Sequence, residues 1–173
     1  EQGLHHLVNE VLDNSIDEVV AGHASEVFFH YKKDGSISIK DNGRGIPIDF
    51  HPKFKNKRAL EIVLSTLHAG GKFDSNSYKT SGGLHGVGIS VVNALSSSLD
   101  VTVFKNSKKY SQEYSRGKVK TKVKIEKCKK NEKGTEIIFI PDETIFETIK
   151  FSPKKLYDFI KMKAVLVSGT SID

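Results

Sequence analysis

An amphipathic helix near the N-terminus is the feature that most constrains this chain. At about 100° per residue, one broad arc of residues 4–21 is apolar and consists of Leu4, Val8, Val11, Leu12, Ile16 and Val19. The opposite arc carries His6, Glu10, Asn14 and Asp17, and residues 1–31 contain no Lys or Arg. The carboxylates of Glu10 and Asp17 and the carboxamide of Asn14 form a row of oxygen ligands that suits a hard cation and leaves one carboxylate to act as a base. The alternative interpretation is an ordinary acidic helix face.

Length and composition indicate one soluble domain. The chain has 173 residues, of which 37% are hydrophobic and 28% are charged. It has neither an apolar run long enough to cross a bilayer nor a signal-peptide pattern, so we expect no membrane partner. The single cysteine, Cys128, excludes an internal disulfide and fits a reducing, cytoplasmic compartment. Because the chain starts at Glu1 without Met, we expect a fragment of a longer protein.

The charge balance is compatible with nucleotide or nucleic-acid partners but does not establish one. The net charge is +6 and the pI is about 9.3. The Lys clusters at 127–130 and 161–163 lack the interleaved aromatic residues of a single-strand binder. A solvated face is therefore the better interpretation of these clusters.

The first half of the chain alternates helices with turns rich in glycine. The first helix should end at Gly22, and residues 26–31 and 36–40 read as strands joined by an Asp-Gly hairpin turn. Residues 41–47 form a tight turn, 58–67 a helix, 68–80 a loop, and 81–88 a glycine-rich segment that enters a helix at 89–95.

The second half is rich in strands. Residues 99–104, 108–114, 118–126 and 135–140 alternate like antiparallel strands. A last helix should start with Ser152 as N-cap and Pro153 at its first position, and continue to about residue 165. The chain therefore predicts an α/β two-layer sandwich, a mixed and mostly antiparallel sheet with helices on one face.

Three features offer nucleotide chemistry, each weakly when taken alone. Gly86 and Gly88 at a helix start present backbone N–H groups to a phosphate, and Lys72 lies on a glycine-flanked loop that can reach the same phosphates. Asp41 at a strand end can accept from the exocyclic amine of a base. The sequence holds no GxxxxGK[ST] loop and no dinucleotide fingerprint, and a G-x-G at a helix start is also a common packing device.

Taken together, four motifs occur in a familiar order: NEVLDNSIDE, DNGRGIP, HAGGKF and SGGLHGVGISVVNALS. In this order the chain resembles, over residues 3–172, the ATPase domain of the bacterial type II topoisomerase B subunits, which are gyrase B and its counterpart in topoisomerase IV. These domains share an ATPase fold with the large heat-shock chaperone, the MutL proteins and sensor histidine kinases. The resemblance implies an N-terminal ATP-binding domain spanning residues 1–173, without the family's N-terminal arm and transducer domain.

The resemblance also implies a role for individual residues. Glu10 matches the general base that polarises the attacking water, and Asn14 matches the Mg²⁺ ligand. Asp41 matches the residue that binds the adenine amino group, with Thr135 beside it. The remaining implied ATP-binding residues are Asp17 at the site's edge, Glu18 paired to Arg44, Gly45, Ile46 and Pro47 around the adenine, and Lys72, Gly83, Leu84, His85, Gly86, Val87 and Gly88 in the lid and phosphate cradle. Taken by itself, His85 is as well explained as a structural residue of its loop.

By this resemblance the chain binds ATP and Mg²⁺ and belongs to an ATP-dependent DNA topoisomerase. The implied partners are a second copy of the same B subunit, a topoisomerase A-type subunit, DNA through the full complex, and ATP-competitive inhibitors at the adenine site. The isolated fragment should bind ATP and hydrolyse it poorly. The KMKAVL segment at 161–166 favours topoisomerase IV over gyrase.

Two other functions remain as alternatives. One is a nucleotide switch that does not hydrolyse ATP, against which the retained Glu10 argues. The other is a chaperone or kinase relative, which DNGRGIP permits and the glycine-rich segments make a poor match.

Overall fold

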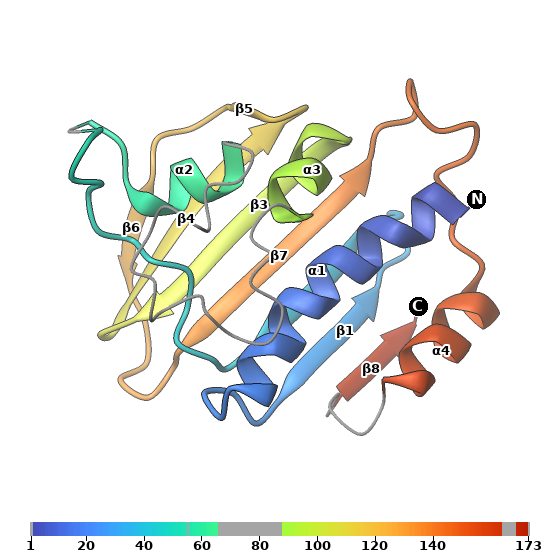
Figure 1. The fold of residues 1–173 in the computed structure, drawn as a ribbon, viewed down its shortest axis with the longest axis horizontal. Helices are drawn as coiled ribbons and strands as arrows, with labels where there is room; N and C mark the ends of the chain where they lie inside the picture. Colours follow the sequence, from blue (N-terminus) through green and yellow to red (C-terminus); the bar gives the residue numbers. More distant parts are fainter. Residues whose placement is uncertain (1, 55, 66–87, 164–168, 173) are drawn as a thin grey trace.

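An eight-stranded sheet organises the molecule. The computed structural model describes residues 2–54, 56–65, 88–163 and 169–172. The strand order is β5-β4-β3-β7-β2-β1-β8, and β6 pairs with β4 beside β5 (Figure 1). The strands are β1 Val27–Tyr31, β2 Ile37–Asp41, β3 Ser96–Lys105, β4 Lys108–Ser115, β5 Lys118–Val119, β6 Lys124–Lys127, β7 Gly134–Pro141 and β8 Gly169–Ile172. β8 runs parallel to β1, and the other described pairings are antiparallel.

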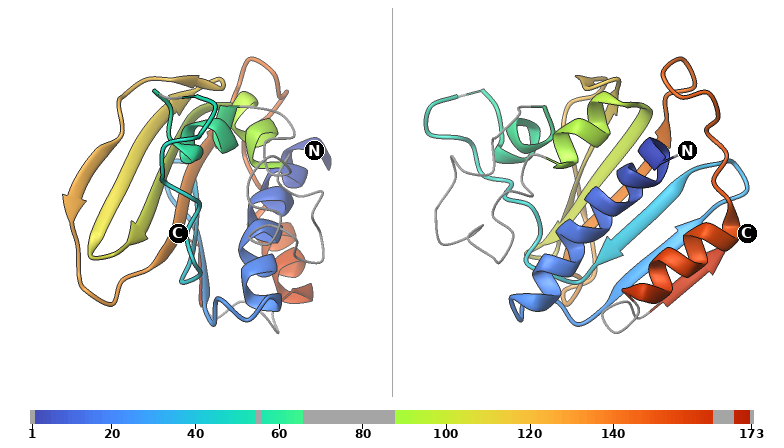
Figure 2. Two further views of the ribbon diagram at one scale, coloured as in Figure 1. Left: turned by 60° about the vertical axis from the view of Figure 1, so that its left-hand side comes forward. Right: turned by 45° about the vertical axis from the view of Figure 1, so that its right-hand side comes forward.

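Four described helices lie on one face of this sheet, as Figure 2 shows. They are α1 Gln2–Val20, α2 Ala59–Ser65, α3 Gly88–Ala94 and α4 Pro153–Met162. α1 packs against β2, β7 and α3, and α3 in turn contacts α2, β3 and β4. The predicted two-layer α/β sandwich with a mixed sheet is confirmed.

The core lies between the sheet and the helices. Leu99, Val101 and Val103 of β3 point into it, because side chains alternate along a strand, while Asp100 and Thr102 between them are half-buried. The apolar arc predicted for the first helix supplies the other side. Its first four members are buried, and Ile16 and Val19 pack against the core from its edge.

The helix α1 ends just before Gly22, as predicted. Gly22 has φ +83°, its N–H donates to the Val19 carbonyl at 3.0 Å, and the His23 N–H donates to the Glu18 carbonyl at 2.9 Å. This pair of bonds is the Schellman arrangement that a glycine permits at a helix C-terminus.

One strand prediction was wrong, and one strand was not predicted. The expected strand at 118–126 is interrupted at Thr121, which does not form the regular backbone hydrogen bonds of a strand pair with β4. Its Oγ1 accepts from the Glu113 N–H at 3.0 Å, and its carbonyl accepts from Gln112 Nε2 at 3.1 Å. β8 was not predicted at all. Its four residues, GTSI, carry no clear apolar alternation and pair with β1, far away in the sequence.

The last helix begins as predicted and is tied to the first. Ser152 is the N-cap of α4, and its Oγ accepts from the Lys155 N–H at 3.3 Å. At the other end, Lys163 Nζ donates to Asn9 Oδ1 at 2.7 Å and pairs with Asp13. The expected end near residue 165 lies outside the described residues. In the described part of the chain, no helix combines the length and apolar character that crossing a bilayer requires.

Replacing Ser152 with Ala should destabilise the fold by about 1 kcal/mol, because the Lys155 N–H loses its acceptor. Thermal unfolding should show a decrease in Tm of about 2–4 °C. The control is Ser152→Asp, which keeps an acceptor at the N-cap and should melt close to the wild type. Equal losses in both variants would show that the cap does not act through this bond.

Candidate functional site

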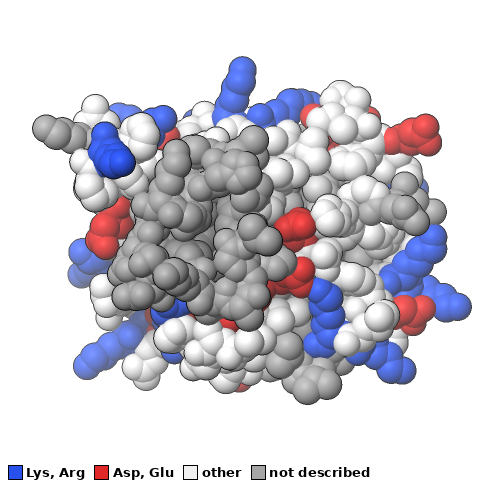
Figure 3. Space-filling view, viewed as in Figure 1, with Lys and Arg blue, Asp and Glu red and all other residues white. Residues whose placement is uncertain are grey.

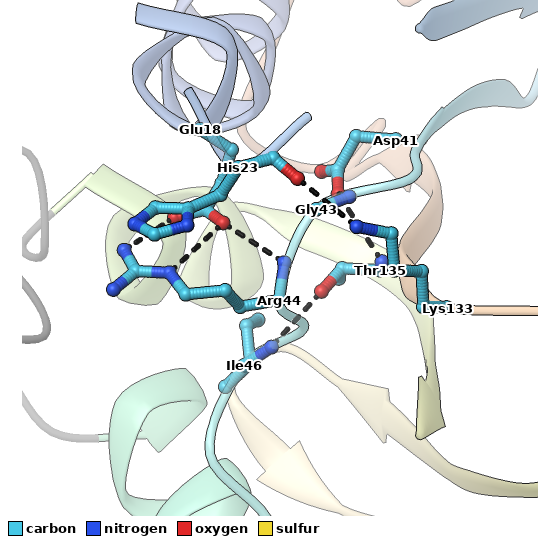
Figure 4. A network of polar contacts seen from close by, with 8 residues as sticks. All are labelled: Glu18, His23, Asp41, Gly43, Arg44, Ile46, Lys133 and Thr135. Carbon is cyan, nitrogen blue, oxygen red and sulfur yellow. Dashed lines mark hydrogen bonds and ion pairs between the residues drawn. The ribbon is translucent and has the colours of Figure 1, made fainter. Parts of the chain in front are cut away.

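The site is built around the buried carboxylate of Asp41, at the end of a central strand. Asp41 is 2% exposed. Its Oδ2 accepts from Ser15 Oγ at 2.8 Å, and its Oδ1 accepts from the Gly43 N–H at 2.9 Å and the Thr135 N–H at 3.4 Å. The carboxylate therefore joins α1, β2, the turn after β2 and β7 (Figure 4).

Burial raises the pKa of Asp41 above its usual range, and the nearby charge of Glu18 adds to that effect. The hydrogen bonds from Gly43, Ser15 and Thr135 favour the charged form but do not cancel the increase. The folded state therefore holds a proton on Asp41 more tightly than the unfolded chain does.

A second acidic group, Glu18, holds the turn that follows β2. Its Oε1 accepts from an Arg44 guanidinium nitrogen at 2.7 Å, and its Oε2 accepts from Arg44 Nε at 3.2 Å and from the Arg44 backbone N–H at 3.0 Å. The pairing expected from the sequence is thus observed. Burial acts to raise the pKa of Glu18, but the hydrogen bonds and charge of Arg44 outweigh it and hold that pKa below its usual range.

Thr135 closes the other side of the same turn. Its Oγ1 accepts from the Ile46 N–H at 3.0 Å, while its own N–H points to Asp41. Gly134, immediately before it, has φ +121°, and a Cβ there would overlap the Asp41 carbonyl. Glycine at this position is what allows β7 to approach the end of β2 so closely.

The catalytic candidate Glu10 lies against the start of α3. A Cβ added to Gly88 would overlap Glu10 Oε2, so the carboxylate touches the glycine backbone directly. His6, one turn earlier on α1, places Nε2 3.1 Å from Glu10 Oε1, and the two side chains are 63% and 19% exposed. Figure 3 shows acidic side chains gathered over α1 on this face of the molecule.

The oxygen donors of α1 would suit a magnesium ion that takes its other ligands from phosphates and water. Asn14 lies half-buried on α1, one turn after Glu10. No group of three or more His, Cys, Asp or Glu residues that could hold a metal occurs among the described residues. Mg²⁺ commonly takes one or two protein oxygens and fills its remaining positions with phosphates and water, so an amide oxygen beside a carboxylate is a sufficient protein contribution.

The remaining predicted residues divide into two groups. Asp17 is half-buried on α1, and Gly45, Ile46 and Pro47 lie in the turn beside Asp41, with Ile46 buried. The other group, Lys72, Gly83, Leu84, His85, Gly86 and Val87, lies outside the described residues, so its placement stays a prediction.

Sequence reasoning missed several residues that shape the site. Ser15 lies among the buried residues of α1, and a hydroxyl on the apolar arc of a helix is a signal that a buried partner exists. Lys133 donates to the His23 carbonyl at 3.3 Å and so connects the start of β7 to the end of α1 (Figure 4). His6 lies on the same predicted arc as Glu10, and the contact between them follows from their spacing of four residues.

The family model described as "Histidine kinase-, DNA gyrase B-, and HSP90-like ATPase" matches residues 1–145. This chain belongs to that ATPase family. Among curated relatives, it is 56% identical over 171 residues to the B subunit of DNA topoisomerase 4 from Rickettsia bellii, covering 98% of this chain and 26% of the relative. It is 49% identical over 173 residues to the B subunit of DNA gyrase from Thermotoga maritima, covering 100% of this chain and 27% of the relative. The chain thus spans about a quarter of the length of these relatives.

Solved structures agree with this assignment. The topoisomerase IV ATP-binding domain of Francisella tularensis, in complex with a small-molecule inhibitor, has a TM-score of 0.82 and 33% identity, covering 98% of this chain and 81% of that one. The 43K ATPase domain of Thermus thermophilus gyrase B, in complex with an aminocoumarin, has a TM-score of 0.77 and 39% identity, covering 90% and 38%. The ATPase fold named by the family model is therefore the fold of this chain.

Replacing Asp41 with Asn should make the protein more stable at pH 7. Asn keeps an acceptor for the Gly43 and Thr135 amides and can donate to Ser15 Oγ, while removing a charge that burial disfavours. Because the folded-state pKa is raised, the wild type loses stability as the pH rises from the unfolded pKa of about 3.9 through the folded value. Thermal unfolding should show a higher Tm for the variant at pH 7 and a difference that shrinks towards pH 4.

Glu18 provides the control for this pH dependence, because its substitution should change the Tm at pH 7 in the opposite direction. Because the pKa of Glu18 is lowered, its contribution is present above the unfolded pKa of about 4.3 and is lost as the pH falls through the folded value. Glu18→Gln should therefore melt lower than the wild type at pH 7, with a deficit that shrinks on acidification. A lower Tm for Asp41→Asn at pH 7 would contradict our account of the buried carboxylate.

Proposed function

We propose that this chain is the ATP-binding and hydrolysing part of a type II DNA topoisomerase B subunit, and that topoisomerase IV is the better match than gyrase. The observation that carries the proposal is an acceptor position on Asp41 that no described residue fills, in a fold whose family binds ATP. A carboxylate offers about four lone-pair positions, and the described partners of Asp41 use three. The fourth suits the exocyclic amine of adenine, which is the role that the resemblance gives this residue.

We assign the phosphates of the nucleotide to the end of the site that lies away from Asp41 and contains Glu10 and Asn14. Glu10 would accept the proton of a water that attacks the terminal phosphate, since its carboxylate lies at the glycine that opens α3. His6 would orient that carboxylate through their contact of 3.1 Å. Asn14 would contribute an oxygen to Mg²⁺, which supplies charge neutralisation at the phosphates when bound. Lys72 and the residues at 83–88 would contact the same phosphates.

The larger assembly is also part of the proposal. Relatives of this sequence are named as the B subunits of DNA topoisomerase 4 and of DNA gyrase, so we infer that the full protein dimerises, acts with an A-type subunit and passes DNA. Topoisomerase IV is favoured because five B subunits of DNA topoisomerase 4 are 55–56% identical to this chain, whereas two gyrase B subunits are 49% and 50% identical. The single cysteine suits the cytoplasm, where the proposal places the enzyme.

The binding site can be tested by calorimetric titration with a non-hydrolysable ATP analogue, with and without Mg²⁺. Asp41→Asn should weaken binding by about 1.5–3 kcal/mol, because one charge-assisted hydrogen bond to the base becomes a neutral one. Asp158→Asn, an exposed site on α4, is the matched control and should bind like the wild type. Unchanged affinity in Asp41→Asn would remove Asp41 from the adenine site.

The base can be tested in the full-length enzyme. Glu10→Gln should keep analogue binding and reduce ATP turnover by about 10²-fold or more, because a positioned base contributes about 10²–10⁴-fold. Glu26→Gln, at an exposed position before β1, controls for loss of a carboxylate. Turnover that survives in Glu10→Gln, with analogue binding intact, would favour a different base; absence of turnover in the wild-type enzyme would favour the nucleotide switch.

A further inference from the structure

The net positive charge of this protein arises in one short segment at one side of the sheet. Residues 118–130 carry seven Lys and one Glu, a net charge of +6 in 13 residues. The other 160 residues carry 20 Lys and Arg and 20 Asp and Glu, so the net charge of the whole chain comes from this segment alone. We call residues 118–130 the basic edge.

The basic edge is an outer border of the sheet and is open to solvent. It contains β5 and β6, which pair in succession with the two ends of β4, and none of its residues is buried. Along the eight residues of β4 it extends for about 26 Å. Figure 3 shows Lys and Arg side chains at this side of the molecule and also at the opposite side.

Most of these lysines form no ion pair with another described residue. Within the described part of the chain, Lys124 is the one lysine of the seven with an ion pair, to Glu126 Oε1 at 3.5 Å. Some basic residues elsewhere are neutralised by a carboxylate: Arg44 pairs with Glu18, Lys163 with Asp13, and Arg116 with Asp142. The basic edge therefore keeps charge that an anionic partner would neutralise.

We propose that the basic edge binds the phosphate backbone of duplex DNA. Its 26 Å correspond to about eight phosphates of one strand, at about 3.4 Å of helix axis each. It contains no aromatic residue on which bases could stack, which favours contact with phosphates over recognition of single-stranded bases. The choice of DNA over another polyanion rests on the proposed function, because the full enzyme would bring duplex DNA to this domain.

A competing explanation is that the lysines only protect the sheet edge. Exposed edge strands template aggregation, and lysine side chains are a common means of preventing it. That explanation accounts for Lys118, Lys124 and Lys127 in the edge strands, but it does not require Lys129 and Lys130, which lie in the loop after β6. An experiment has to separate DNA binding from protection of the edge.

The test compares two triple variants of equal charge. The edge variant is Lys118→Gln, Lys122→Gln and Lys127→Gln, and the control variant is Lys150→Gln, Lys154→Gln and Lys161→Gln, all at exposed positions. Binding to a fluorescent duplex of about 30 base pairs and arbitrary sequence is measured by anisotropy between about 50 and 200 mM KCl. At about 100 mM the edge variant should bind at least about tenfold more weakly than the control, and the slope of log K against log salt should decrease by about 2–3, or about 0.9 per lost contact.

Several results would overturn the proposal. They are equal losses in the two variants, no detectable duplex binding by the wild type, and edge-dependent binding to vesicles containing phosphatidylserine without binding to the duplex. Aggregation of the edge variant by light scattering, with unchanged duplex affinity of its monomer, would likewise assign the lysines to edge protection. The same preparations are also titrated with the ATP analogue. The wild type, the edge variant and the control variant should bind the analogue equally whether or not the basic edge binds DNA, so failure of this proposal can be told apart from failure of the proposed ATP-binding function.

Discussion

The arrangement of the site depends on one buried carboxylate, that of Asp41. A charged group in the core is costly unless hydrogen bonds compensate it, and Asp41 obtains them from a helix, a turn and a neighbouring strand. These contacts explain features that would otherwise look unrelated. They include a serine on the buried side of α1 and a glycine at the start of β7 where any side chain would collide with the Asp41 backbone.

Elements with a local signal could be predicted from the sequence. The 3.6-residue period identified α1, Gly22 marked its end, and Ser152-Pro153 marked the start of α4, because each depends on residues within a few positions of one another. β8 could not be predicted, since four residues without alternation are defined by their pairing with β1. The break between β5 and β6 depends on how Thr121 hydrogen-bonds to β4, which no pattern of hydrophobicity encodes.

In the site, too, some features could be predicted from the sequence and others depend on contacts between distant segments. The order of four motifs identified Glu10, Asn14 and Asp41 as candidates, and the pairing of Arg44 with Glu18 was expected correctly. The contact of Glu10 with Gly88 joins segments far apart in the sequence, and the role of Ser15 requires knowing that α1 crosses the end of β2. Segregation of charge was visible in the sequence only as lysine clusters, because their meaning depends on β5 and β6 forming an outer border of the sheet.

The hydrogen bonds of Asp41 have a consequence for folding. Its partners Ser15 and Thr135 lie 26 and 94 residues away along the chain, so the carboxylate receives these hydrogen bonds only after α1 and the central strands have assembled. Local opening at the site would then require breaking the middle of the sheet. A ligand held there would slow hydrogen exchange across β2, β3 and β7 rather than in one loop, since it stabilises the globally folded state by RT ln(1 + [L]/Kd). Occupancy of the nucleotide site would thus be reported by the rigidity of the whole sheet.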